Sequence, residues 1–129
     1  MIKLISRSRI NSSADMNDFV IDAQGVLKEY KGRGGDVVIP DGVTWIDGWL
    51  FEGDTNLTTV TIPDSVTHII DCAFKDCANL TSIIIGNGVI RIGDFAFWGC
   101  PLKSVTIPDS VEYVGHCAFN KEVRLHRVR

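Results

Sequence analysis

Large apolar residues return along the chain at a nearly constant interval. Two columns share this period, with successive spacings of 23, 23 and 22 residues. They are the isoleucines Ile39, Ile62, Ile85 and Ile107 and the phenylalanines Phe51, Phe74, Phe97 and Phe119. Two independent columns with one period indicate four copies of a single structural unit.

The second unit illustrates the structure expected of each copy. In "LTTVTIPDSV", Val60 and Ile62 alternate with threonines, which is the period of a strand with one buried face. Pro63 cannot donate to a strand ladder and so ends the strand, and Asp64 and Ser65 form a turn at this corner. The apolar spacing in "DCAFKDCANL" favours a short helical or 3₁₀ turn. Because one unit cannot bury its apolar side alone, stacked copies are expected to form a solenoid of parallel strands about 4.8 Å apart.

The N-terminal part differs from the repeats. The segment "FVIDAQGVLKEYKG" places two alternating runs around a turn at Ala23 to Gly25 and predicts a β-hairpin that caps the first unit. We assign residues 18–35 to this capping hairpin and residues 36–129 to the repeats. Residues 1–17 are interpreted as an N-terminal extension, with Met16 as an alternative start of the chain.

The C-terminal end is expected to be uncapped. "LHRVR" begins a fifth strand in which Leu125 should take the column of Leu80 and Leu102. An edge strand with unpaired backbone groups invites self-association, and proteins blunt such edges with charge. We expect three arginines to serve here in that way. They are Arg124, Arg127 and Arg129.

The repeat resembles a known family. The segment "IPDSVTHIIDCAFKDCANLTSI" is similar to the BspA-like leucine-rich repeat, whose units read roughly L-x-x-V-x-I-P-x-x-V-x-x-I-G-x-x-A-F-x-x-C, and the match runs from Asp18 to about Val128. The resemblance implies an α/β fold: a right-handed leucine-rich-repeat solenoid of about four coils with parallel strands, short helical turns and an N-terminal β-hairpin cap. It also implies a bacterial, cell-surface or secreted protein that binds host or partner proteins and catalyses nothing.

Composition and charge narrow the function classes only slightly. The chain has 129 residues, 45% of them hydrophobic, and a net charge of -3, which fits one globular domain and argues weakly against nucleic-acid binding. No apolar stretch approaches the length of a membrane span, and "MIKLI" is too short to form the core of a secretory signal. We therefore expect no membrane insertion, and the compartment is unknown.

The residues that often carry chemistry fall in structural positions. The histidines His68, His116 and His126 occupy different places in the repeat, so we expect no metal site and no cofactor. Asp64 and Ser65 beside His68 recur as turn residues, which argues against an enzyme.

The four cysteines occupy two repeat columns. Cys72 matches Cys117, and Cys77 matches Cys100, so we expect four buried, reduced thiols. Of these pairs, only Cys77 and Cys100 lie on adjacent coils within reach of a disulfide.

One outward column is the candidate protein-binding site. It consists of Trp45, His68, Arg91 and Tyr113, each directly before an inward Ile or Val. Aromatic residues and arginine are enriched in binding hot spots. The alternative is a stacked, solvated ladder with minor cation–π packing. Of the other tryptophans, Trp49 is expected to be buried and Trp98 exposed.

The long strands present a second outward surface. Thr59, Ser82 and Ser104 should line up on it as a flat face with almost no charge. We predict a non-catalytic module for protein–protein interaction, with an unidentified partner. The alternatives are a structural repeat segment of a surface protein, a self-associating module, and a flat-face binder of ice or glycan. The last would require a regular T-x-T array, which Ile84 interrupts.

Overall fold

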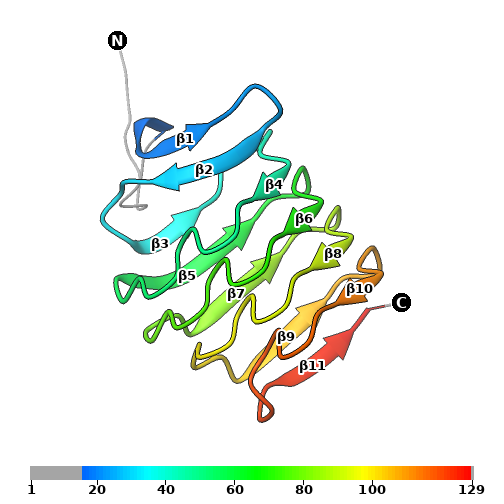
Figure 1. The fold of residues 1–129 in the computed structure, drawn as a ribbon. Helices are drawn as coiled ribbons and strands as arrows, with labels where there is room; N and C mark the ends of the chain where they lie inside the picture. Colours follow the sequence, from blue (N-terminus) through cyan, green and yellow to red (C-terminus); the bar gives the residue numbers. More distant parts are fainter. Residues whose placement is uncertain (1–15, 129) are drawn as a thin grey trace.

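The protein is a stack of β coils (Figure 1). The computed structural model describes residues 16–128, so the N-terminal extension up to residue 15 lies outside the described residues. A short 3₁₀ helix, Met16–Asp18, is followed by strands in the order β1 Phe19–Ile21, β2 Val26–Tyr30, β3 Gly35–Val38, β4 Trp45–Ile46, β5 Leu57–Ile62, β6 His68–Ile69, β7 Ser82–Ile85, β8 Arg91–Ile92, β9 Ser104–Ile107, β10 Tyr113–Val114 and β11 Arg124–Arg127.

The strands form two sides of the stack (Figure 1). On one side the short strands pair continuously in the order β1-β2-β4-β6-β8-β10. On the other side the long strands form two separate sheets, β3-β5-β7 and β9-β11. All pairs between coils are parallel, and only β1 and β2 are antiparallel, as expected for a capping hairpin. The predicted solenoid and its cap are therefore confirmed.

The core lies between the two sides and is built from the predicted columns. The four phenylalanine rings stack almost face to face, with successive centroid distances of 4.8, 5.0 and 5.2 Å. Phe74 and Phe97 are fully buried. The ring of Tyr30, on the capping hairpin, lies 5.3 Å from that of Phe51 and extends the stack by one member. The cap thus covers the first coil with apolar surface.

The connecting segments contain turns where short helical turns were expected. In the second coil, Ala73 and Lys75 donate to carbonyls three residues back, but Phe74 and Asp76 donate to the next coil. Because alternate N–H groups serve the neighbouring coil, a helical ladder cannot form. Cys72 and Asp76 also adopt positive φ angles of 63° and 61°, which interrupt a right-handed helix.

The register of the fifth strand differs from the expected one. Leu125 pairs with Val105, and Val123 packs against the core one turn earlier. The prediction that Leu125 continues the column of Leu102 is therefore wrong by three residues. The connection between Phe119 and β11 is shorter than its counterparts, so the repeat spacing no longer gives the register.

Candidate functional site

The candidate column forms a ladder in the structure. Pairing of the short strands places its four members in register, one on each coil. They are Trp45, His68, Arg91 and Tyr113, and we call them the outward ladder. Each is followed by an inward residue of the core or its margin, so the backbone of the ladder is fixed by packing on the other face of the same strand.

The first half of the outward ladder is a stacked pair. The rings of Trp45 and His68 lie 4.7 Å apart with an interplanar angle of 28°. The hydroxyl of Thr67 donates to the Thr44 carbonyl, so its oxygen accepts from Nδ1–H of His68 at 2.9 Å. This arrangement fixes the histidine ring and leaves Nε2 as the other nitrogen for an incoming group. Trp45 is 43% exposed, so one face of the pair stays accessible.

The second half is a cation–π pair. The guanidinium carbon of Arg91 lies 3.9 Å from the centroid of the Tyr113 ring. The Tyr113 hydroxyl is 3.4 Å from Oδ1 of Asp94, to which it donates a long hydrogen bond. The same carboxylate oxygen accepts from the backbone N–H of His116 at 2.8 Å. Tyr113 is therefore held by both Arg91 and Asp94, which reduces the side-chain entropy that a partner would have to remove.

An ion pair borders the ladder at its N-terminal end. Nζ of Lys28, on β2, lies 2.8 Å from Oδ2 of Asp47. Hydrogen bonding to Lys28 lowers the pKa of Asp47 below its usual value. Both side chains are well exposed, so this pair marks the rim of the surface and adds little stability.

A second aromatic group was missed by the sequence analysis. Phe95 makes edge contacts with the rings of Trp98 and His116, at centroid distances of 6.1 and 5.9 Å. Trp49, predicted to be buried, is 58% exposed, and Trp98 is half-buried where exposure was expected.

The misplaced Trp49 lies in a column with an unusual backbone. This column has positive φ in every coil, between 53° and 63° in Trp49, Cys72, Phe95 and Cys117. Trp49, Cys72 and Phe95 donate their N–H groups to the next coil, and burial differs along the column: Trp49 is largely exposed, whereas the smaller Cys72 is buried. In the sequence, this position can be recognised only because it directly precedes the repeated Leu-Phe or Ala-Phe pair.

The hydroxyl face is interrupted. Thr59 pairs with Ser82, as predicted, but the expected alignment of Ser82 with Ser104 is not a hydrogen-bonded pairing, because β7 and β9 belong to different sheets. The face is also less uniform than expected. Asp36 adds a carboxylate that accepts from the Thr59 hydroxyl at 2.6 Å, and Ile84 is 61% exposed.

A one-residue deletion coincides with the break. Coils one and two close with "TNL" and "ANL", whereas coil three closes with "CPL" and lacks the asparagine. In coil two, the side chain of Asn79 donates to the Thr55 carbonyl at 2.7 Å and ties the two coils together. In coil three, Pro101 has no N–H, and Leu102 donates back to Cys100 instead. The connection of coil three is therefore one residue shorter than that of coil two and lacks this side-chain hydrogen bond.

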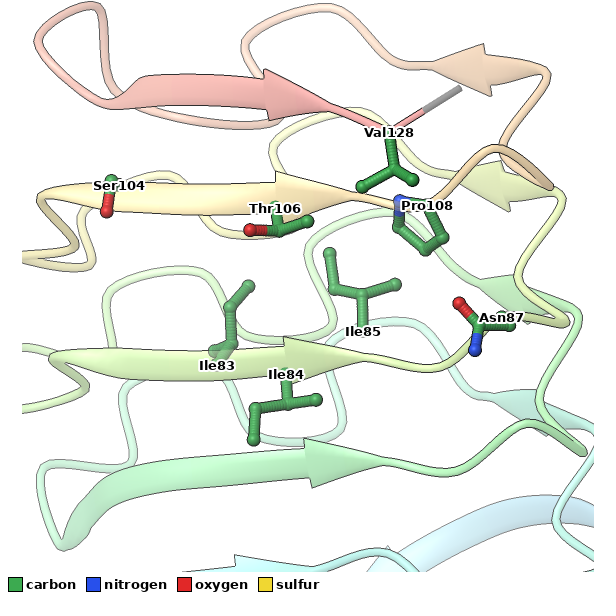
Figure 2. Close-up of a pocket in the computed structure, with 8 residues that line it drawn as sticks. All are labelled: Ile83, Ile84, Ile85, Asn87, Ser104, Thr106, Pro108 and Val128. Atoms are coloured by element: carbon green, nitrogen blue, oxygen red, sulfur yellow. The ribbon is translucent and has the colours of Figure 1, made fainter.

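The break leaves a shallow groove of about 270 Å³ between β7 and β9 (Figure 2). Core residues are slightly exposed along it: Ile83 is 9% exposed, against 1% for the equivalent Val60. No charged side chain lines the groove. Its lining consists of Ile83, Ile84, Ile85, Asn87, Ser104, Thr106, Pro108 and Val128.

The cysteines follow the predicted columns with one exception. Cys77 and Cys100 are fully buried, and their thiols donate to the carbonyls of Phe51 and Phe74 at 3.0 and 3.1 Å. The neighbouring Cys100 thiol and burial raise the pKa of Cys77. All four cysteines are free, but Cys117 is only half-buried where burial was expected.

Comparison with known proteins identifies the repeat. The pattern of the BspA type leucine rich repeat region (6 copies) matches residues 35–126. The chain belongs to the BspA-type leucine-rich repeat family. No curated protein matches it.

Two solved structures share the fold of this BspA-type chain. A leucine-rich repeat protein of T. pallidum (TpLRR) aligns with a TM-score of 0.69 and 25% identity over 86% of this chain and 68% of its own. One from Bacteroides ovatus aligns with a TM-score of 0.57 and 25% identity over 86% of this chain. The BspA-type chain spans 41% of that second protein.

The BspA-type coils place few reactive groups together. Within residues 16–128, no cluster of three or more potential metal ligands occurs, and no polar or charged residue is buried. No helix of this part is long and apolar enough to cross a membrane. Large outward-facing side chains of the BspA-type coils contact one another in the outward ladder and in the aromatic group around Phe95.

Proposed function

We propose that this BspA-type chain is a non-catalytic module that binds another protein through the outward ladder. The observation that carries the proposal is the ladder itself. Four large side chains stand on consecutive coils, and contacts of 4.7 and 3.9 Å join them in two pairs. Such side chains give more contact energy for less ordering cost than a sheet of serine and threonine.

The dimensions of the ladder suit the centre of a modest interface. Three coil spacings of about 4.8 Å give a length of about 14 Å. A standard interface buries about 800 Å² on each partner and concentrates its binding energy near the middle.

The experiment compares matched variants in a binding assay. The immobilised chain is incubated with extracts of the cells that produce it and of the material they contact, and retained proteins are identified by mass spectrometry. A true partner should be retained by Thr59→Ala and Thr106→Ala and lost with Trp45→Ala or Arg91→Ala. With the purified partner, calorimetry should show that each ladder substitution weakens binding by at least about 1 to 2 kcal/mol.

The control variants decide between surfaces. If the ladder substitutions leave the affinity unchanged and the threonine substitutions lower it, the binding surface is the long-strand face, and the proposal is wrong. If all four variants bind alike, the chain acts through another surface or as a structural repeat. Melting curves of each variant separate lost binding from lost folding.

A further inference from the structure

The outward ladder contains one cation that forms no ion pair. The guanidinium carbon of Arg91 lies 3.9 Å from the centroid of the Tyr113 ring, and Arg91 is exposed. The ion pairs in the part of the chain that the structure describes join Lys28 to Asp47 and Lys75 to two carboxylates. None of them involves Arg91, so its charge is available to an incoming anion.

The Tyr113 ring orders this cation for a particular kind of anion. A guanidinium that lies over a ring keeps its N–H groups, which are in its own plane, for hydrogen bonds. The ring is itself held, since its hydroxyl donates to Oδ1 of Asp94 at 3.4 Å. The planar fork of N–H donors matches the two oxygens of a carboxylate. Arg91 therefore meets a bidentate carboxylate at a lower ordering cost than an unsupported arginine would.

Carboxylates border Arg91 on the same side of the stack. Asp94 follows it by three residues in the same coil, and Oδ1 of Asp71 accepts from the backbone N–H of Asp94 at 2.9 Å. Glu112, directly before Tyr113, is exposed. These negative charges repel a dense polyanion such as a nucleic acid. The surroundings therefore favour a single carboxylate at Arg91 with a cation beside it.

The other half of the outward ladder offers apolar contact at a fixed distance. Trp45 is 43% exposed and stacks on His68 at 4.7 Å. Trp45 and Arg91 are two coils apart, which corresponds to about 10 Å along the stack. An extended peptide advances about 3.3 Å per residue, so about three residues cover this distance.

We propose that Arg91 is the anchor for one carboxylate of the partner protein, an inference that rests on the proposed function of the outward ladder. The carboxylate belongs to a segment in which an acidic residue lies about three residues from a large apolar one and beside a basic one. The apolar side chain packs on Trp45 and His68, and the basic side chain faces Glu112. The aromatic contact supplies area, and the carboxylate supplies selectivity.

The test titrates the full 129-residue chain with blocked seven-residue peptides and follows NMR shifts. The first peptide has leucine at its second position, glutamate at its fifth and lysine at its sixth, with glycine elsewhere. It should shift Nε–H of Arg91 and the amides of the four short strands that carry the ladder. The same peptide with glutamine in place of glutamate should bind about fivefold more weakly. A phosphoserine version should bind no more tightly than the glutamate peptide, because the surrounding carboxylates repel its second charge.

Matched variants separate the fork of donors from charge alone. Arg91→Lys keeps the positive charge but loses the planar fork, so the preference for glutamate over glutamine should largely disappear. Tyr113→Leu removes the ring that orders the guanidinium and should reduce the preference, whereas Tyr113→Phe keeps the ring and should preserve it. Arg33, which is exposed on the connection before β3, supplies the control: Arg33→Lys should change nothing.

Several results would overturn the inference. They are equal binding of the glutamate and glutamine peptides, no binding of either by a chain that circular dichroism shows to be folded, a full preference for glutamate in Arg91→Lys, and tighter binding of the phosphoserine peptide.

The inference can also fail while the proposed function stands. A partner that is lost with Trp45→Ala and Arg91→Ala but binds Arg91→Lys normally uses the outward ladder without a bidentate carboxylate. A partner that tolerates both alanine substitutions contradicts the proposed function instead, and the peptide titration then decides on the carboxylate site by itself.

Discussion

Replacement of Phe97 by alanine removes a central ring of the core stack. The ring is fully buried and lies between Phe74 at 5.0 Å and Phe119 at 5.2 Å, both nearly parallel to it. No side chain can fill the space from outside, because the coils above and below hold their own rings in place. Phe97→Ala therefore leaves a cavity that the solenoid cannot easily close.

The size of the effect follows from burial and stacking. Truncation of a buried phenylalanine costs about 3 to 5 kcal/mol. Each lost aromatic pair adds about 0.5 to 1.5 kcal/mol beyond buried area, and Phe97 loses two pairs. Together they give a loss of about 4 to 8 kcal/mol, whose lower end already approaches the whole stability of a marginal small domain. Phe119→Ala is the matched control. Phe119 is 8% exposed and stacks on Phe97 alone among the core rings, so its loss should cost about 3 kcal/mol or less.

Urea unfolding followed by tryptophan fluorescence and circular dichroism measures both variants. If Phe97→Ala does not fold, Phe97→Leu keeps most of the volume and should lose only about 1 to 2 kcal/mol. A loss below about 1 kcal/mol for Phe97→Ala would show that the stack is not the core. A larger loss for Phe119→Ala than for Phe97→Ala would refute the argument from stacking.

Three further predictions concern the thiols, the last strand and the groove. In native buffer an aqueous thiol reagent should modify Cys117 first, because the other cysteines are buried and burial raises the pKa of Cys72; equal rates for all four thiols would contradict this. Serine in place of the three C-terminal arginines should promote association in sedimentation, because charge then no longer blunts the open edge. An asparagine inserted between Pro101 and Leu102 should restore pairing of β7 with β9, seen as slower amide exchange at Ser104; unchanged exchange would mean that the deletion does not cause the break.

The repeat spacing predicted the core and the outward ladder for the same physical reason. Between Ile39 and Tyr113, the distance from each isoleucine to the ladder position is the same in every coil. Equal spacing in a solenoid places equivalent residues directly above one another. The constant spacing therefore predicted which residues are neighbours in the ladder, and the structure places them in the predicted register. That the ladder binds a protein stays a prediction.

The features that the repeat spacing failed to predict depend on backbone conformation and on the length of the connections between strands. Trp49 has an apolar side chain in an apolar repeat column, but it adopts a positive φ of 63° and is largely exposed, whereas the smaller Cys72 at the same position is buried. Periodicity reports which residues are equivalent and carries no information on φ. Leu125 was misplaced because the last connection is shorter than the others, so the period no longer applied.

The break between β7 and β9 also bears on what the long-strand face can bind. These strands do not pair in coil three, which carries the one-residue deletion, yet β8 and β10 stay paired and the rings of Phe97 and Phe119 stay stacked. The stack therefore opens on the long-strand side alone. Recognition of a periodic surface such as ice requires hydroxyl groups at a constant spacing over several strands. Here an exposed Ile84 and a gap interrupt the array after β7, so the long-strand face is a poor candidate for a flat-face binder. The uninterrupted array of this protein is the outward ladder, and that continuity is the reason to test it first.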